Sequence, residues 1–288
     1  MDMWLGGLFC LFLGMGMLMA ASHAMPPLHI KNKWQGGGYG CVVTALLHSS
    51  SAVSCSVCAM TAGGKMELGA AFSVLVGSNV GTCVTPILTA LGLQAQGMDL
   101  LFPLLGIFAI LIRPKFPNLS TSVAGFCLLM WGMNIMTASP KSFLALSKAP
   151  LWRGLLGSPL GAFAVGLFST ALLQSSSLTM GLLQVYSLTS PLSVGVALPF
   201  ILGQNIGTTA TALLATLGAS PIARQTAMYH TRFNVLGAVW ALPLSMVLWK
   251  YLAFDATPMM LGVLQLVYNL ICALLHLLFD PKLNFADR

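Results

Sequence analysis

One eight-residue stretch, Thr170 to Ser177 (TALLQSSS), repeats an earlier stretch, Thr44 to Ser51 (TALLHSSS), with a single difference at the fifth position. The same offset of 126 residues aligns Gly40 to Gly92 with Gly166 to Gly218 without a gap. A repeat of this length decides the architecture, because each copy is one structural unit. The chain is therefore predicted to consist of two related halves.

A second cluster within this alignment also agrees closely: Gly77 to Thr82 (GSNVGT) matches Gly203 to Thr208 (GQNIGT). The halves thus agree most where residues are polar, small and helix-weakening, whereas a generic duplicated helix bundle would repeat its apolar pattern. Polar residues are costly inside hydrocarbon unless they line a site. Paired Gly-interrupted segments at matching places in two halves are the sequence feature that indicates a transporter's substrate site.

The composition is that of an integral membrane protein. Of 288 residues, 57% are hydrophobic and 7% charged, and the mean hydropathy is +0.87, whereas soluble domains have about 25% charged residues. The 13 Lys and Arg residues are scattered singly, which excludes a nucleic-acid stripe. Cys55 and Cys58 lack a second pair at zinc-ligand spacing, so the cysteines are expected to be small buried apolar residues, with no bound cofactor.

The apolar runs predict an all-α membrane fold. The runs at about 36–62 and 154–190 are each broken by a serine triplet into pieces shorter than the roughly 20 residues of a helical span. We therefore predict two re-entrant helical hairpins with the serines at their tips. Crossing helices, some interrupted by the Asn-x-Gly-Thr groups, are predicted at Trp4 to Ala21, Glu67 to Leu91, Met98 to Ile112, Leu119 to Ala138, Leu192 to Leu217, Thr226 to Trp249 and Pro258 to Phe279.

The domain organisation follows from these spans: a first repeat over 1–115, a second over 116–250, and a C-terminal transmembrane helix with a short tail over 251–288. Leu5 to Leu18, followed by the small residues from Ala21 to Ala24, imitates a signal peptide. The preceding stretch carries Asp2 and no basic residue, which favours a retained helix over Trp4 to Ala21. Eight Lys and Arg residues fall in loops on one side and four on the other, which makes the first side cytoplasmic. The first hairpin then enters from inside and the second from outside. We predict an inverted-topology repeat in the plasma (inner) membrane, with the C-terminus in the cytoplasm.

An oxyanion inside a membrane needs donors and a positive field, yet the serine and Asn-x-Gly-Thr segments contain no Lys or Arg. The second arm of each hairpin begins a helix, whose free amides and partial positive charge point at the tip. Hydroxyl donors are supplied there by Ser49, Ser50 and Ser51 and by Ser175, Ser176 and Ser177. Two tips facing each other would form an anion cradle.

Cations bound nearby would balance the anion's charge, and Na⁺ prefers hard oxygen ligands. An unwound helix would expose such oxygens at Asn79, Thr82, Asn205, Thr208 and Thr209. The alternative is that these side chains bond their own backbone or hold helices together, which does not explain why both halves keep them in register. His230 and Asn234 lie one helical turn apart and can share a face, in the site or as a structural pair.

At these residues the chain resembles the type II sodium/phosphate cotransporter family, whose repeats each carry a Gln-Ser-Ser-Ser hairpin tip. Gln174 to Ser177 matches this tip, Gly203 to Thr209 looks like the family's Gly-x-Asn-Ile-Gly-Thr-Thr element, and Arg224 to Asn234 is similar to a segment of bacterial members. The resemblance runs from the first helix to about Leu244. It implies a re-entrant-hairpin fold with inverted repeats and Na⁺-driven symport of inorganic phosphate, with Gln174 joining the phosphate site and Ser175 serving both ions.

The first repeat departs from the family pattern at two positions. His48 takes the Gln position, and because histidine changes charge near neutral pH, transport would depend on pH. Cys83 takes the second Thr position and is a poor Na⁺ ligand, which leaves the sodium stoichiometry open. The alternatives are a carrier of another oxyanion or with another coupling ion, a channel or structural protein, and an intramembrane enzyme with a Ser nucleophile and His48 or His230 as base. No third orienting residue is apparent, so we predict that the protein is not an enzyme.

Overall fold

The computed structural model describes residues 27–91, 98–137 and 154–285, with scattered positions between 6 and 20. The predicted first helix, Trp4 to Ala21, lies largely outside the described residues. Within these ranges the chain is helical, and its one extended pairing is an isolated antiparallel bridge between Ser193 and Asp255. The predicted all-α class is therefore confirmed for the part of the chain that is described.

Two pairs of helices correspond to the predicted hairpins. The first pair is α2 (Lys33–Leu47) and α3 (Ser50–Ala62), and the second is α10 (Pro159–Leu173) and α11 (Ser176–Thr189). Only two residues join the helices of each pair, and the serine triplets lie at these joints. The first arms begin where polar side chains cap them, because Asn32 accepts from the Gln35 amide and Ser158 from the Gly161 amide.

Each pair is followed by a helix that breaks after its Asn-x-Gly-Thr group. In the first half α4 (Leu68–Thr82) gives way to α5 (Val84–Ala90), and in the second α12 (Val194–Thr208) gives way to α13 (Ala210–Ala215). At the breaks the backbone tightens, since the Cys83 amide bonds Val80 and the Thr209 amide bonds Ile206, three residues back. The predicted interruptions therefore lie at equivalent positions in the two halves.

Glycines allow these helices to pack backbone against backbone. A methyl group at Gly77 of α4 would overlap the carbonyl of Gly37 in α2, and one at Gly203 of α12 would overlap the carbonyl of Phe163 in α10. Small residues permit such close approach between membrane helices. The repeated glycines thus fix each broken helix against the first arm of its own hairpin.

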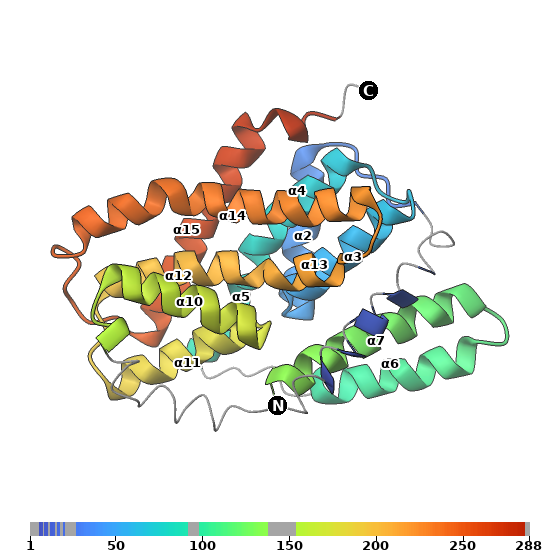
Figure 1. Cartoon of the computed structure of the whole chain (residues 1–288), viewed down its shortest axis with the longest axis horizontal. Helices are drawn as coiled ribbons and strands as arrows, with labels where there is room; N and C mark the ends of the chain where they lie inside the picture. Colours follow the sequence, from blue (N-terminus) through green and yellow to red (C-terminus); the bar gives the residue numbers. More distant parts are fainter. Residues whose placement is uncertain are drawn as a thin grey trace.

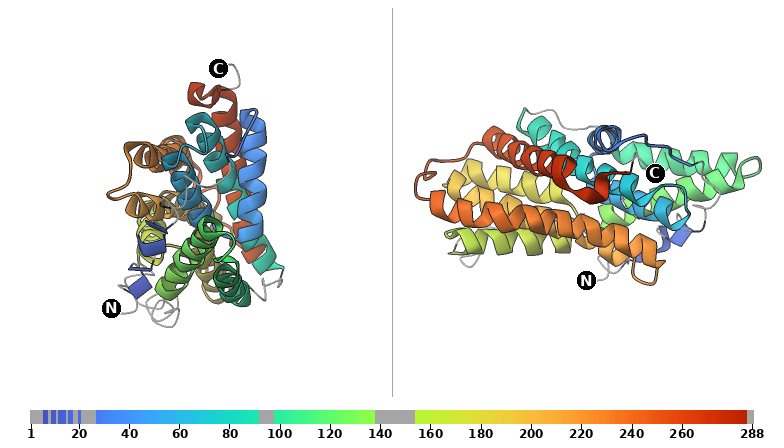
Figure 2. Two further views of the ribbon diagram at one scale, coloured as in Figure 1. Left: turned by 90° about the vertical axis from the view of Figure 1, so that its right-hand side faces the viewer. Right: turned by 90° about the horizontal axis from the view of Figure 1, so that it is seen from above.

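The remaining helices enclose the two broken ones. They are α6 (Met98–Ile112), α7 (Pro117–Thr137), α14 (Pro221–Leu248), α15 (Pro258–Phe279) and the short 3-10 helix η1 (Pro281–Leu283). Figure 1 shows α14 lying across the molecule beside α12 and α13, and both views of Figure 2 show α6 and α7 side by side at one edge. The core packs α4, α12, α14 and α15 together, and nearly every residue of α4 and α12 is buried.

Three helical segments in the described ranges are long and apolar enough to cross a membrane: Leu68–Ala90, Pro221–Leu248 and Pro258–Phe279. Large apolar side chains stand exposed along the outer faces of the last two, including Val235, Val239, Leu244 and Val247 of α14 and Val263, Val267, Leu270, Leu274 and Leu278 of α15. Such a surface suits lipid and is far larger than soluble proteins tolerate.

The chain leaves the two hairpins at opposite ends of α14, whose 28 residues span about 42 Å. Gly64, directly after the first hairpin, lines a pocket with Ile222 at the start of α14. The segment after the second hairpin instead pairs with the loop that follows α14, because the Val194 amide bonds Phe254 and the Gly195 amide bonds Leu252. The chain therefore leaves the first hairpin near the start of α14 and the second hairpin near its end.

Candidate functional site

Both hairpin tips turn through a residue in the left-handed conformation. His48 has φ 52° and ψ 25°, and Gln174 has φ 56° and ψ 19°. They are the only non-glycine residues with positive φ in the described part of the chain. Side chains other than Gly and Asn adopt this conformation at a cost, and such residues concentrate at functional sites. The two tips share one unusual backbone geometry although their residue types differ.

The serine after each turn caps the helix that follows. The Ser49 hydroxyl oxygen accepts from the Ala52 amide at 3.2 Å, and the Ser175 hydroxyl oxygen accepts from the Leu178 amide at the same distance. The first amides of a helix have no intrahelical acceptor. The first two amides of each following helix, those of Ser50, Ser51, Ser176 and Ser177, bond no other described residue. Each tip therefore presents two unused N–H donors at the positive end of a helix.

The structure brings the two tips together. The Ser177 hydroxyl donates to the His48 carbonyl oxygen at 3.4 Å, which joins the second tip to the first. The first tip also contacts the second half through Ser51, whose hydroxyl oxygen accepts from Thr211 of α13 at 3.2 Å. Two segments far apart in the sequence thus meet in the interior, where Ser50, Ser51 and Ser176 are buried.

The broken helices brace the tips differently in the two halves. In the second half, the amide nitrogen of Gln204 donates to the Ser176 carbonyl at 2.5 Å. In the first half, Nδ1 of His48 lies 2.9 Å from the Thr85 hydroxyl of α5. The side chain of Gln174, the counterpart of His48, donates instead to the Ala171 carbonyl of its own helix. The residue difference at the turn therefore changes which element holds the tip.

Several buried side-chain oxygens near the tips have no hydrogen-bond partner among the described residues. Two of them, the hydroxyl oxygens of Thr44 and Thr170, are at equivalent positions and pack against Gly81 and Gly207 of the breaks. Gln174 Oε1 and Gln204 Oε1 are unpartnered as well. Unsatisfied buried polar atoms are rare, and each indicates strain or a missing partner such as water or an ion.

The predicted Asn79 and Asn205 each pair with a helix outside the repeats. Asn79 donates to Asn234 Oδ1 at 2.5 Å, and its own amide oxygen lies 3.0 Å from His230 Nε2. Asn205 donates to Asn269 of α15 at 2.7 Å. His230 and Asn234 do share one face of α14, as predicted, and that face meets the first break. All five of these side chains are buried.

The predicted threonines bond mainly to their own helices. The Thr82 hydroxyl donates to the Ser78 carbonyl and the Thr208 hydroxyl to the Gln204 carbonyl, both at 3.0 Å. Thr209 donates to the Ile206 carbonyl and accepts from Thr231 of α14 at 3.1 Å. Their hydroxyl protons are therefore used, while a lone pair on each oxygen can still face a cation.

Sequence reasoning missed four residues of this region. Thr44 and Thr170 stand one turn before the tips, Gln204 contacts the second tip, and Asn269 links the two breaks by donating to Cys83 Sγ at 3.2 Å. The sequence does not single out Asn269, because Gln265 is a second amide in the same apolar span.

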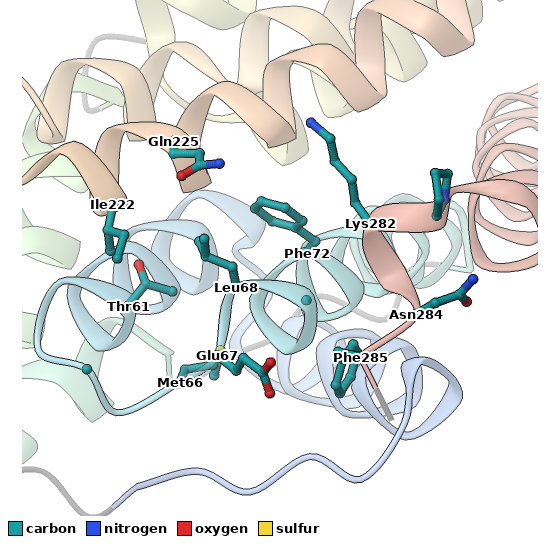
Figure 3. Close-up of a pocket in the computed structure, with 13 residues that line it drawn as sticks. Thr61, Met66, Glu67, Leu68, Phe72, Ile222, Gln225, Lys282, Asn284 and Phe285 are labelled. Carbon is teal, nitrogen blue, oxygen red and sulfur yellow. The ribbon is translucent and has the colours of Figure 1, made fainter. Parts of the chain in front are cut away.

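One pocket of the described structure lies away from the tips. It has a volume of about 520 Å³ and lies between the base of the first hairpin, the start of α4, the start of α14 and η1. Figure 3 shows Gln225 and Lys282 on one side of it and Glu67 on the other. No tip residue lines it, so this pocket is separate from the meeting point of the tips.

Comparisons with known proteins agree with the repeat and the polar motifs. The family model described as Na⁺/Pi-cotransporter matches twice, over residues 21–138 and 128–267, so each half matches it. An uncharacterized protein of Bacillus subtilis (strain 168), YqeW, is 29% identical over 204 residues, which are 70% of this chain and 66% of that relative. No solved structure matches. The chain is an integral membrane protein that belongs to the Na⁺/Pi-cotransporter family.

Proposed function

We propose that this protein is a symporter that couples the movement of inorganic phosphate to sodium, with the phosphate bound between the two hairpin tips. The contact between Ser177 and His48 is the observation that carries this proposal. It supports the proposal because it joins the two tips, each followed by a helix N-terminus, and helix N-termini are ready-made anion sites. The hydroxyls of Ser49, Ser50, Ser175 and Ser176 and the side chain of Gln174 complete the proposed cradle.

The proposed fold is a pair of re-entrant hairpins related by inverted topology. It is supported by the placement of the hairpin bases near opposite ends of α14. It is also supported by the basic residues that border the end where α14 begins: Lys31, Lys33, Lys65, Arg224 and Lys282. Under the positive-inside rule this end faces the cytoplasm of a plasma membrane. The C-terminus then lies on the cytoplasmic side.

Sodium is proposed to bind at the helix breaks, close to the phosphate. The unpartnered oxygens of Thr170, Gln174 and Gln204 support this proposal, because Na⁺ needs hard oxygen ligands. These neutral oxygens are the candidate ligands, since no described acidic residue is hydrogen-bonded at the breaks. Asn205, Thr208 and Thr209 add an amide oxygen and two hydroxyls at the second break. Asn79 and Thr82 are the corresponding candidates at the first.

The enzyme alternative has less support. A serine nucleophile needs a base within hydrogen-bond reach. Among the described residues no serine hydroxyl is bonded to a histidine ring, since the His48 ring meets Thr85 and the His230 ring meets Asn79. A carrier of sulfate or arsenate remains the alternative within transport, because the amides and hydroxyls at the tips suit any tetrahedral oxyanion.

Uptake of labelled phosphate by proteoliposomes tests the proposal. An inward Na⁺ gradient is expected to raise uptake well above that in equimolar choline, because each tenfold gradient supplies about 1.4 kcal/mol per ion. Excess unlabelled phosphate is expected to compete more strongly than sulfate. Equal uptake in Na⁺ and choline would refute sodium coupling, and stronger competition by sulfate than by phosphate would refute the substrate.

A further inference from the structure

We propose that the cation site is confined to the second repeat, and that His230 closes the equivalent place in the first repeat with its own ring N–H. The inference rests on the proposed function. It narrows the proposed sodium site from the two helix breaks to the second one. It starts from one difference: Asn79 and Asn205 occupy matching positions, yet only Asn79 uses both ends of its amide.

The orientation of the Asn79 amide follows from a chain of contacts that begins at a backbone carbonyl. The His230 carbonyl can only accept, so the Asn234 atom 3.1 Å from it is the amide nitrogen. Asn234 Oδ1 therefore faces Asn79 and receives its N–H. The Asn79 oxygen then points at His230 Nε2, 3.0 Å away, and Nε2 must carry the proton. In the first repeat a protein N–H thus takes one of the two acceptor sites of this amide oxygen, and its positive end opposes a cation there.

The matching amide in the second repeat also donates to an asparagine, but its oxygen receives no donor. The Cys83 thiol donates to the Asn79 carbonyl, which leaves its sulfur to accept from the Asn269 amide nitrogen. Asn269 Oδ1 therefore faces Asn205 and takes its N–H at 2.7 Å. Asn205 Oδ1 accepts no hydrogen bond from any described residue, although the side chain is only 5% exposed. An amide oxygen without a donor is available to a cation.

The neighbouring positions repeat this asymmetry. Gln204 and Gln174 of the second repeat each bury an unpartnered side-chain oxygen. Their counterparts in the first repeat are Ser78, which donates to the Leu75 carbonyl, and His48, which pairs with Thr85. The hydroxyls of Thr44 and Thr170 are unpartnered in both repeats. The asymmetry therefore lies at Gln174 and Gln204, whose free oxygens have bonded counterparts in His48 and Ser78.

The two halves consequently have different tasks. The second break binds and releases an ion, so its oxygens stay free of protein donors. The first break is closed by His230, Asn234 and Asn79, and Asn269 joins it to the ion-binding side through Cys83. A duplicated transporter has in this way kept its two-fold layout while retaining a single cation site.

Matched substitutions of the two asparagines test this inference. Na⁺, with choline as the control, is expected to raise the melting temperature of the purified wild-type protein, because an ion that binds the folded state stabilises it. In Asn205→Ala this rise should vanish or need at least tenfold more Na⁺. Asn79→Ala should melt at a lower temperature in choline, since it breaks the contacts with α14, yet keep the rise with Na⁺. Equal loss of the Na⁺ response in both variants would overturn the inference.

A second pair of variants tests His230 and does not depend on the folding of Asn79→Ala. His230→Gln retains an N–H donor for Asn79 and is expected to keep the wild-type ratio of radioactive sodium to phosphate influx. His230→Leu frees the Asn79 oxygen, so the ratio should rise as a second ion enters. A ratio that stays constant in His230→Leu would contradict the blocking role. Wild-type phosphate uptake that does not depend on Na⁺ would instead refute the proposed function itself.

Discussion

Ser175→Asp is expected to abolish phosphate uptake while the protein still folds. Aspartate is as good a helix cap as serine, so its carboxylate can keep accepting from the Leu178 amide, as the Ser175 hydroxyl does at 3.2 Å. The same carboxylate places a negative charge where the phosphate is proposed to bind. Two like charges 4 Å apart repel by about 4 kcal/mol at an effective dielectric constant of 20, which corresponds to roughly a thousandfold loss of affinity.

Ser158→Asp is the matched control for that substitution. Ser158 caps the first arm of the same hairpin, and its hydroxyl oxygen accepts from the Gly161 amide at 3.2 Å. The side chain is exposed at the far end of α10 from the tip. Uptake by Ser158→Asp should therefore equal that of the wild type. Normal uptake by Ser175→Asp, or equal losses in the two variants, would show that the tip does not bind the anion.

Gly203→Ala is expected to cause a large loss of stability for a change of one methyl group. The added carbon would overlap the Phe163 carbonyl, which belongs to a backbone and cannot rotate away. Overpacking of this kind costs about 1–3 kcal/mol when side chains can adjust, and more when they cannot. We expect a loss of at least about 3 kcal/mol, measured as a lower melting temperature in detergent.

Gly38→Ala is the control for the glycine prediction. Gly38 lies in α2, between glycines that touch α4, but nothing stands within 4 Å of the position its methyl group would take. Alanine is favoured over glycine in a helix interior by about 1 kcal/mol. Gly38→Ala should therefore melt no lower than the wild type. A Gly203→Ala protein as stable as Gly38→Ala would disprove the close contact between α10 and α12.

Much of the architecture was readable from the repeated motifs, for a physical reason. Serines cap helices through nearby amides, so the tips after Leu47 and Leu173 follow from local sequence. The Asn-x-Gly-Thr groups weaken a helix locally as well, which gives the breaks at Cys83 and Thr209. The predicted spans agree with α6, α7, α14 and α15 within a few residues. The hairpins' passage through a bilayer and the ion ligands stay predictions.

The pairings between helices were not readable from the sequence. Asn269 lies in an apolar helix whose sequence does not indicate which residue contacts a break. Its role becomes visible only in the packing of α15 between the two breaks. His230 was recognised as sharing a face with Asn234, but periodicity cannot say which helix that face meets. The unequal use of Asn79 and Asn205 depends on single hydrogen bonds across such interfaces, so it is invisible to a comparison of the two repeats alone.

Phosphate binding to purified wild-type protein, Ser49→Asp and Ser175→Asp tests the central claim most directly. If the tips form one shared site, the wild type binds one phosphate per chain in the presence of Na⁺, and either substitution alone removes all of the binding. The Ser158→Asp protein should bind as the wild type does. Binding that survives in either Ser49→Asp or Ser175→Asp, or that falls by half in each, would contradict a single site between the two tips.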